Sequence, residues 1–247
     1  MKSILFCGND KVFDGMITTM LSIFKRSISE EGIRFYIFTM NLTRLKADYM
    51  PVSDRQIDFL DELAKSYNPE HSVVKIDVTD TYEKEFALCP NEGCYCSPYT
   101  LIRLFADMEP RIPEKFLYLD IDLLFNRDID LLWNTDIEGY EYAASRDHYG
   151  KFLIHPNFIN AGVLLFNMKK CRETGLFEKS RKLIKTKKLT FADESAIIRS
   201  TVRKKILSQR FNDQKFLYRN TVIRHFSRRL FWLPYPHVEN IKQWHIT

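Results

Sequence analysis

Short apolar runs alternate along the first half of the chain with segments whose apolar residues recur at helical spacing. Four runs rich in branched and aromatic residues predict buried strands: 3–7, 34–39, 73–76 and 116–121. Between them, apolar stripes over 17–24 and 57–64 predict amphipathic helices, and we expect the first helix to end near Gly32. Such alternation indicates crossover units, so we predict an α/β fold with a mostly parallel central sheet and helices on both faces.

Two short polar motifs predict where helices begin. Ser53 with Gln56 three residues later forms a capping box, in which each side chain can bond the backbone N–H of the other residue. Ser97 followed by Pro98 places a helix cap before a proline at the first helical position, where its missing N–H costs nothing. A strand over 116–121 follows the second of these helices.

The size and composition are those of an ordinary globular protein. The chain has 247 residues, of which 45% are hydrophobic and 28% charged, which excludes disordered, collagen-like and solenoid proteins. No stretch approaches the roughly 18 uncharged apolar residues of a membrane span, and the apolar start is too short for a secretory signal. The five cysteines are odd in number and fit no common zinc spacing, so we expect reduced thiols. We therefore predict one cytoplasmic domain over 1–247.

Positive charge is concentrated late in the chain. Between 179 and 229 there are sixteen lysines and arginines against three acids, a net charge of +13. Because the whole chain carries +5, the other residues sum to −8. Such a cationic segment suits a phosphate-bearing ligand, an anionic membrane surface or nucleic acid, although a solvated helix face gives the same pattern.

The most informative candidates for chemistry are two aspartates, Asp120 and Asp122, at the end of the run 116–121. Side chains two residues apart on a strand point the same way, so the two carboxylates should lie together. Carboxylates among apolar residues are costly unless they are paired or bind a cation, and Mn²⁺ or Mg²⁺ prefers such oxygen ligands. Two aspartates that cap the next turn are the structural alternative. A phosphatase of the haloacid dehalogenase type is a further one, but Leu124 stands where those enzymes carry threonine.

Three later stretches add candidates, each with a plain structural alternative. The small residues of 160–162 open an apolar strand, where glycine marks either the close approach of a ligand or a β-bulge. Asp193 and Glu194 open a helical segment, so they either act in a site or serve as a helix cap and a favourable first-turn acid. His225 lies among cations after a short strand and becomes a metal-ligand candidate only if it meets Asp120 and Asp122.

These motifs, in this order and spacing, resemble the retaining glycosyltransferases of family 8, which include bacterial lipopolysaccharide galactosyl- and glucosyltransferases and glycogenin. Residues 117–122 look like the family's DxD motif, and 160–163 look like its Asn-Ala-Gly motif. The resemblance implies a metal site of three ligands: Asp120, Asp122 and His225. It implies two catalytic residues: Asp193 and Glu194. It implies further donor contacts through Asn9, Asp10, Arg103, Ile121, Asn160, Ala161 and Gly162.

Within that resemblance the parts have distinct roles. Asn9 and Asp10 fall where the family binds uracil and ribose, and Arg103, Asp193 and Asn160 would position the donor sugar. The fold implied is the GT-A type, related to the Rossmann fold, with the donor-binding part over about 1–125 and the sugar, acceptor and basic parts over about 126–247. The activity implied is Mn²⁺- or Mg²⁺-dependent transfer of galactose or glucose from a UDP-sugar, with retention, to a glycan or lipid-linked acceptor in cell-surface glycan synthesis. The basic C-terminal segment with its aromatic residues is compatible with peripheral membrane contact, but a place in the core explains those aromatic residues better, and we expect no nucleic acid partner.

The chain departs from the family pattern at two places. After His225 the usual glycine and diphosphate-binding lysine are missing, and we expect Arg228 or Arg229 to supply the charge, since guanidinium binds phosphate oxygens bidentately. Family members often carry glutamine where this chain has Glu194, and a carboxylate beneath the anomeric carbon can act as a nucleophile, although front-face attack assisted by the leaving phosphate needs none.

Two other functions stay open from the sequence alone. One is a two-aspartate phosphotransferase or nucleotidyltransferase, which would release phosphate or pyrophosphate. The other is a non-catalytic basic binding module with a degenerate donor site, which would bind with steep salt dependence and no turnover.

Overall fold

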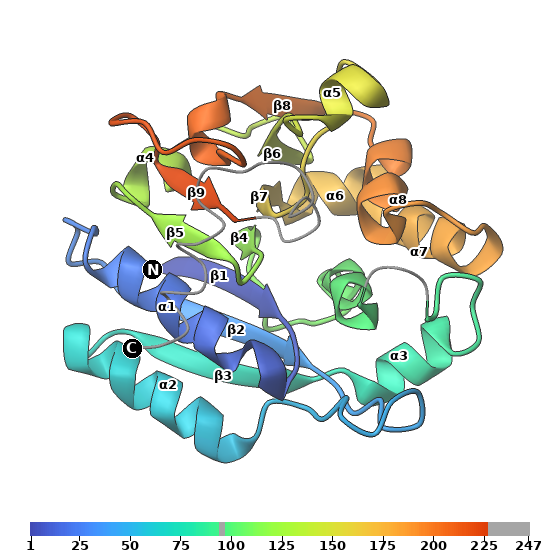
Figure 1. Ribbon diagram of the computed structural model, residues 1–247, viewed down its shortest axis with the longest axis horizontal. Coiled ribbons are helices and arrows are strands. Elements are labelled where there is room, and N and C mark those ends of the chain that lie inside the picture. Colours follow the sequence, from blue (N-terminus) through green and yellow to red (C-terminus); the bar gives the residue numbers. More distant parts are fainter. Residues whose placement is uncertain (94–96, 227–247) are drawn as a thin grey trace.

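The computed structural model describes residues 1–93 and 97–226, which form a seven-stranded sheet with helices on both faces (Figure 1). The strand order is β3-β2-β1-β4-β7-β6-β8. The strands are β1 (Lys2–Cys7), β2 (Ile33–Thr39), β3 (Ser72–Asp77), β4 (Lys115–Leu119), β6 (Tyr142–Ser145), β7 (Val163–Asn167) and β8 (Lys204–Leu207). Two short strands, β5 (Leu123–Phe125) and β9 (Ile223–His225), pair antiparallel in a separate small sheet.

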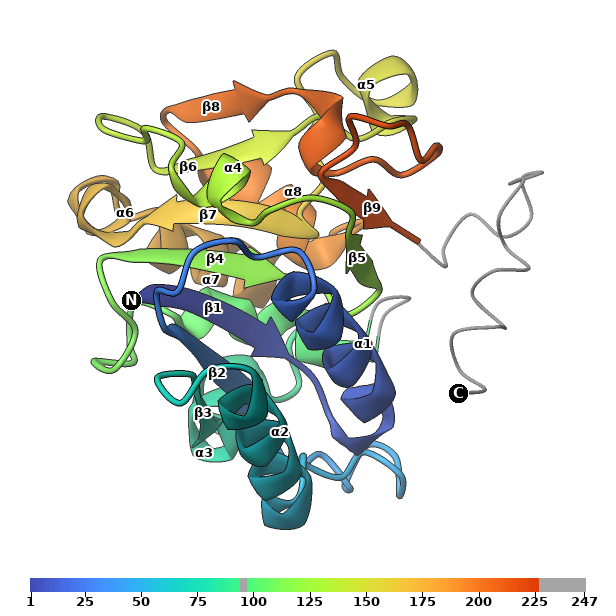
Figure 2. The same ribbon diagram turned by 90° about the vertical axis from the view of Figure 1, so that its left-hand side faces the viewer.

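The large sheet is mostly parallel, as the sequence predicts. β1 pairs in parallel with both β2 and β4, β2 with β3, and β6 with β8. In the described sheet only β7 runs the other way, between β4 and β6. The carboxyl ends of β1 and β4 therefore meet at one edge, which is also where β5 and β9 lie (Figure 2).

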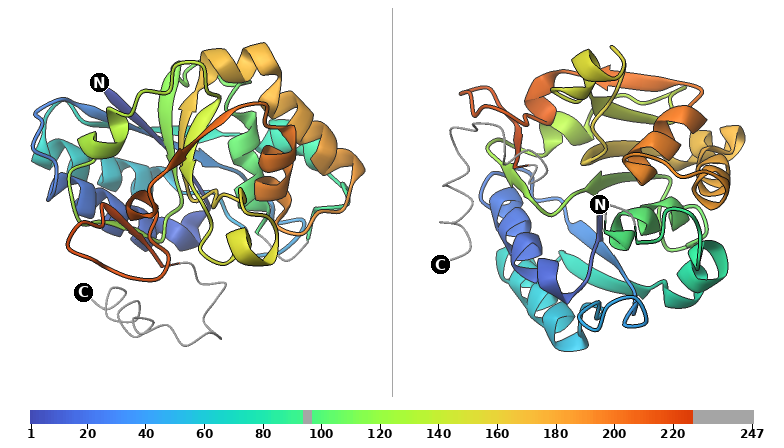
Figure 3. Two further views of the ribbon diagram at one scale, coloured as in Figure 1. Left: turned by 90° about the horizontal axis from the view of Figure 1, so that it is seen from above. Right: turned by 45° about the vertical axis from the view of Figure 1, so that its right-hand side comes forward.

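Two apolar cores lie on opposite faces of the sheet. One joins β1, β2 and β4 to α1 (Phe13–Phe24), α2 (Asp54–Tyr67) and the small sheet. The other joins the same strands to α3 (Thr79–Phe86), the 3-10 helix η2 (Pro98–Phe105), α7 (Leu176–Thr186) and α8 (Ala192–Ser200). Figure 3 shows the strands enclosed between the two groups of helices. The remaining helices are η1 (Asp10–Val12), α4 (Asp130–Trp133), α5 (Gly150–Leu153), α6 (Met168–Thr174) and η3 (Gln209–Phe211).

The predicted helix beginnings are confirmed. Ser53 and Gln56 form both hydrogen bonds of the capping box at the start of α2. The Ser97 hydroxyl accepts a hydrogen bond from the Tyr99 N–H and caps the helix that starts at Pro98, although its turns are 3-10 rather than α-helical. No helix among the residues that the structure describes is long and apolar enough to cross a lipid bilayer.

Two expectations about element ends are wrong. α1 ends at Phe24 and not near Gly32. Gly32 lies instead where the chain passes Glu70 so closely that an added Cβ would be 2.9 Å from the Glu70 carbonyl oxygen. β4 ends at Leu119, so Asp120 and Asp122 lie in the turn between β4 and β5 rather than on the strand.

Candidate functional site

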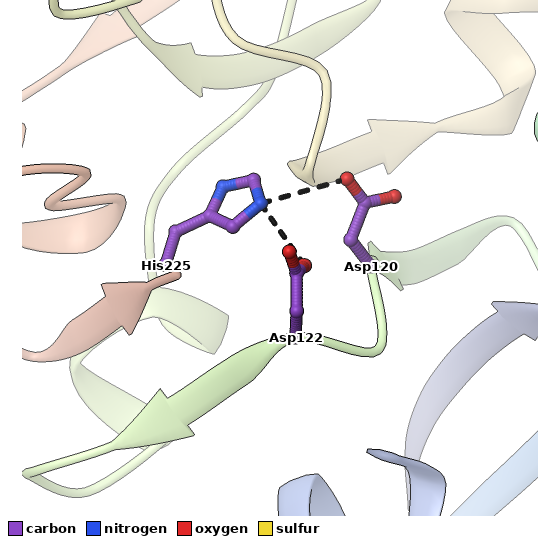
Figure 4. Close-up of side chains that lie close together, drawn as sticks. All are labelled: Asp120, Asp122 and His225. Carbon is purple, nitrogen blue, oxygen red and sulfur yellow. Dashed lines mark ion pairs between the residues drawn. The ribbon is translucent and has the colours of Figure 1, made fainter. Parts of the chain in front are cut away.

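Three predicted ligands come together at the carboxyl-end edge of the sheet. Asp120 and Asp122 flank the turn between β4 and β5, and His225 ends β9 directly opposite Leu123 of β5. The His225 Nε2 lies 3.1 Å from Asp122 Oδ1 and 3.8 Å from Asp120 Oδ2 (Figure 4). Both carboxylates point toward the histidine and so lie together, as strand alternation predicted, although a turn and not a strand carries them.

This group fits a divalent cation. Among the described residues, one ligand atom from each of Asp120, Asp122 and His225 lies within 4.8 Å of the others. Two carboxylate oxygens and an imidazole nitrogen form a ligand set that Mn²⁺ accepts, and Mg²⁺ accepts its oxygens. His225 is buried and the two aspartates are about a quarter exposed, so a ligand can reach the carboxylates from one side.

Gly162 keeps the space between the ligands open. A Cβ at this position would lie 2.4 Å from His225 Cε1 and 2.8 Å from Asp120 Oδ2. The Gly162 carbonyl also accepts a 2.8 Å hydrogen bond from the Asp120 N–H, which fixes the start of the turn. The glycine of the predicted Asn-Ala-Gly motif is therefore required by close approach, and no β-bulge is needed to explain it.

Helix α1 supports the turn from below. The Ile121 carbonyl lies so close to Gly15 that a Cβ there would be 2.6 Å from its oxygen. The Thr19 hydroxyl, one turn further along α1, donates to the Leu123 carbonyl at 3.1 Å. Ile121 itself packs against the core beside α1. The backbone that carries the two aspartates is thus held by a rigid helix.

Arg103 joins the two acidic parts of the site. Its Nη2 lies 3.2 Å from both Asp120 Oδ1 and Asp193 Oδ2, and its Nη1 donates to the Ala161 carbonyl at 2.6 Å. The side chain is only 2% exposed. Burial acts to lower the pKa of Arg103, but the nearby Tyr118, Asp193 and Asp120 outweigh it and raise that pKa. The guanidinium is thus a permanent buried cation between two carboxylates.

Tyr118 is a site residue that the sequence analysis missed. Its ring centroid lies 3.8 Å from the Arg103 guanidinium carbon, and its hydroxyl donates to Asp120 Oδ1 at 2.6 Å. Burial raises the pKa of Tyr118 well above its ordinary value, which keeps the phenol protonated and able to donate. Because Arg103 and Tyr118 both occupy Oδ1, the Oδ2 of Asp120 is the oxygen that faces His225. Tyr118 stands two residues before Asp120, and this spacing could have revealed the tyrosine.

The first turn of α8 supplies the other two acidic residues. Asp193 and Glu194 are both buried at the second and third positions of the helix, and the capping position is Phe191, so Asp193 is not the helix cap. Asp193 accepts a hydrogen bond from the Thr100 hydroxyl at 3.2 Å besides its contact with Arg103. Glu194 Oε1 accepts the Ala161 N–H at 3.0 Å and so anchors the Asn-Ala-Gly segment.

Asn9 and Asp10 follow β1 at the same edge of the sheet. Asn9 is buried, and Asp10 opens the 3-10 helix η1. Among the described residues, Asp10 Oδ1 is one of the few buried side-chain oxygens without a hydrogen-bond partner. A buried carboxylate oxygen of this kind calls for a donor, and a ligand hydroxyl would supply one.

Asn160 is placed by its neighbours. Its Oδ1 accepts the Gly162 N–H at 3.0 Å, and its Nδ2 donates to Asp147 Oδ2 at 3.1 Å. Asn212 also contacts Asn160. Neither Asp147 nor Asn212 could be predicted from the sequence, because both reach Asn160 only through tertiary contacts. Arg228 and Arg229 lie outside the described residues.

Comparison with known proteins identifies the family. Residues 3–221 match the family model described as glycosyl transferase family 8. A Haemophilus influenzae protein whose name assigns it to the glycosyltransferases is 26% identical over 188 residues, 72% of this chain and 52% of that protein. The chain thus spans about half the length of this relative.

Solved glycosyltransferases share the fold. The galactosyltransferase LgtC, in complex with donor and acceptor sugar analogs, has a TM-score of 0.70 and 19% identity over 90% of this chain and 86% of its own. The bifunctional WbbM has a TM-score of 0.71 and 16% identity over 92% of this chain and 45% of its own. GlyE of Streptococcus pneumoniae has a TM-score of 0.67 and 17% identity over 92% of this chain and 55% of its own. At these identities the likeness shows the GT-A type of fold. Since the family match itself covers most of the chain, the protein belongs to glycosyl transferase family 8.

Proposed function

We propose that the chain transfers a hexose, galactose or glucose, from a UDP-sugar to a glycan or lipid-linked acceptor with retention at the anomeric carbon. The observation that carries this proposal is the group of Asp120, Asp122 and His225 at the strand ends, with Arg103 bound behind it. Family membership favours this reading over the phosphotransferase and the binding module, because both alternatives leave the Asn-Ala-Gly segment without a role.

The proposed division of labour follows the geometry. Asp120, Asp122 and His225 would hold Mn²⁺ or Mg²⁺, which supplies positive charge to the donor diphosphate as UDP departs. Asp10, with its unpartnered oxygen, and Asn9 would receive the nucleoside at the end of β1. The bond from the anomeric carbon to the phosphate oxygen would break, a bond to the acceptor oxygen would form on the same face of the sugar, and the proton of the acceptor hydroxyl would pass to the departing diphosphate.

The sugar would lie against the Asn-Ala-Gly segment and the start of α8, which are in direct contact through the Glu194–Ala161 hydrogen bond. Arg103 joins the same two parts, because it contacts Asp193 and donates to the Ala161 carbonyl. In this arrangement residues 1–125 carry the nucleotide contacts, and 126–247 carry the sugar and acceptor contacts. Charge from Arg228 or Arg229 on the diphosphate and a membrane contact through the basic C-terminal segment stay predictions, because 227–247 lies outside the described residues.

The cation site is tested with Asp122→Asn. This change keeps one oxygen ligand but removes the negative charge, and metal charge stabilisation is worth several kcal/mol, so we expect Mn²⁺-dependent UDP release to fall about a hundredfold. UDP release is measured over a panel of UDP-sugars with and without Mn²⁺. Asp58→Asn, on the exposed face of α2, is the matched control and should behave like the unsubstituted chain. Equal Mn²⁺-dependent release of UDP by both variants would reject the metal site. The UDP-sugar that the unsubstituted chain consumes identifies the donor.

Glu194→Gln tests the proposed catalytic carboxylate. Glutamine keeps an oxygen to accept the Ala161 N–H, so the fold of the segment is preserved while the charge is lost. We expect kcat to fall about a hundredfold with KM little changed, because the carboxylate stabilises positive charge that develops at the anomeric carbon.

Glu141→Gln is the control for a lost buried carboxylate. Glu141 accepts the Val202 and Arg203 N–H groups at 2.8 Å at the start of β6, on the opposite edge of the sheet from the site. The Glu141→Gln change should lower the melting temperature without changing kcat. Unchanged kcat in Glu194→Gln would exclude both a nucleophilic and an electrostatic role for Glu194.

A further inference from the structure

A line of polar side chains runs behind the candidate cation site. It consists of Asp147, Asn160, Asn212 and His225. The Asn160 Nδ2 lies 3.1 Å from Asp147 Oδ2, and the Asn212 Nδ2 lies 2.8 Å from Asn160 Oδ1. The His225 Nδ1 lies 3.0 Å from Asn212 Oδ1. Asn212 is completely buried and is the one link between the Asn-Ala-Gly motif and the histidine ring in this line.

The direction of every hydrogen bond in the line is fixed from its far end. The Gly162 backbone N–H can only donate, so the Asn160 atom that receives it must be the oxygen. An ionised carboxylate can only accept, so the Asn160 atom next to Asp147 must be the nitrogen. These two constraints agree, and they hold the Asn160 amide in one orientation.

The Asn160 orientation in turn fixes the orientation of the Asn212 amide and the tautomer of the His225 ring. Because Asn160 presents its oxygen, Asn212 must present its NH₂ group, which leaves the Asn212 oxygen facing His225 Nδ1. The ring therefore carries a proton on Nδ1 to donate to that oxygen. In the neutral imidazole the lone pair is then on Nε2, the atom that lies 3.1 Å from Asp122 Oδ1.

Backbone hydrogen bonds hold the segments that carry Asn212 and His225 side by side. The Asp213 N–H donates to the Ile223 carbonyl at 2.9 Å, and the His225 N–H donates to the Asp213 carbonyl at 2.9 Å. Asp147 is anchored as well, because its Oδ1 accepts the N–H groups of Tyr149 and Gly150 and its Oδ2 accepts the Gln214 amide. Asn212 is thus held rigidly against both of its neighbours.

We infer that Asn212 is a positioning residue that keeps His225 in the tautomer whose Nε2 can bind the cation. The inference rests on the proposed metal-dependent function. A hydrogen bond to the second nitrogen of a metal-binding histidine sets its tautomer and orientation, and its loss typically lowers metal affinity about 10- to 100-fold.

The test compares Asn212→Leu and Asn212→Asp by Mn²⁺ binding, measured by electron paramagnetic resonance of the free ion, alone and with saturating UDP. Leucine matches the size of asparagine but cannot accept the Nδ1 proton, so we expect affinity to fall about 10- to 100-fold. Aspartate still accepts it, although it loses the hydrogen bond to the Asn160 oxygen, so Asn212→Asp should recover part of the affinity that leucine loses, since a carboxylate is itself a common partner of metal-binding histidine. A role in packing alone would predict no such rescue.

Asn91→Leu is the matched control. Asn91 is also buried, and its side-chain amide bonds only to backbone groups, among them the Leu189 N–H at 2.8 Å. Asn91→Leu should therefore lower the stability of the protein and leave its Mn²⁺ affinity unchanged. If Asn212→Leu does not fold, Asn212→Ala is compared with Asn91→Ala in the same way. Full Mn²⁺ affinity in the folded Asn212 variant would overturn the inference while the metal site stands. No Mn²⁺ binding by the unsubstituted chain in either titration would overturn both.

Discussion

Arg103→Leu is expected to lower the free energy of unfolding by about 3–5 kcal/mol, because removing one partner leaves buried charge uncompensated. Asp193 is 1% exposed and would lose its cationic partner, and Asp120 would lose one of the two donors that fix its Oδ1. The Ala161 carbonyl would lose its 2.6 Å hydrogen bond as well. Since Arg103 contacts residues of both the proposed cation site and the proposed sugar site, we also expect transfer to fall about a thousandfold or more.

Stability and activity can be separated with two further variants. Arg181→Leu removes another nearly buried arginine, which bonds the Leu104 carbonyl at 2.6 Å and Asp107, and it should destabilise the fold without slowing transfer. Adding Asp193→Asn to Arg103→Leu removes the stranded charge, so part of the lost stability should return while transfer stays low. Unfolding is followed by denaturant titration, and kcat/KM is measured well below each melting temperature. Normal kcat/KM in folded Arg103→Leu would contradict the proposed role.

Arg103→Lys distinguishes charge from geometry. The guanidinium serves Thr100, Ala161, Asp120 and Asp193 at once through three nitrogens. An ammonium group keeps the charge but has no planar fork, so it cannot reach all four acceptors. We expect stability between those of the leucine variant and the unsubstituted chain, with activity close to that of the leucine variant.

Features set by neighbouring residues could be predicted from the sequence. The capping box at Ser53 depends on two residues three positions apart, and both of its hydrogen bonds are present. Apolar runs along the chain predict the buried strands and their alternation with helices. That alternation in turn predicts the mostly parallel sheet that the structure contains. A local pattern, the spacing of two residues, predicted that Asp120 and Asp122 lie together, whereas resemblance to a family added His225, and the structure places all three within reach of one ion.

Features set by close tertiary approach could not be predicted. Gly32 looked like a helix end, but its role is to let the chain pass Glu70. Asn212 follows η3 and has no motif around it, because its function comes from lying between Asn160 and His225. Tyr118 looked like one more aromatic residue of a buried strand until Arg103 was found against its ring. In each case the missing information is which distant residue comes near.

Gly162→Ala is expected to abolish cation-dependent transfer with a single added methyl group. Gly162 does not adopt a left-handed φ, so alanine is compatible with the backbone and the effect is one of space. The new Cβ would lie 2.4 Å from His225 Cε1 and 2.8 Å from Asp120 Oδ2, and one or both ligands must move. A displacement of about 1 Å at a reacting centre costs about a hundredfold, and displacing two ligands should bring the loss in kcat/KM to about a thousandfold.

The control for Gly162→Ala is a glycine that is also crowded, although less so, and lies far from the site. Gly32→Ala puts its Cβ 2.9 Å from the Glu70 carbonyl oxygen, at the opposite edge of the sheet. Overpacking of this kind typically costs about 1–3 kcal/mol, so both variants should lose stability on that scale. Only Gly162→Ala should also lose Mn²⁺ affinity, because only its methyl group lies among the ligands. If the two variants kept the same Mn²⁺ affinity and the same kcat/KM, the space beside Gly162 would not be where the cation binds, and His225 and Asp120 would have to be assigned a purely structural role.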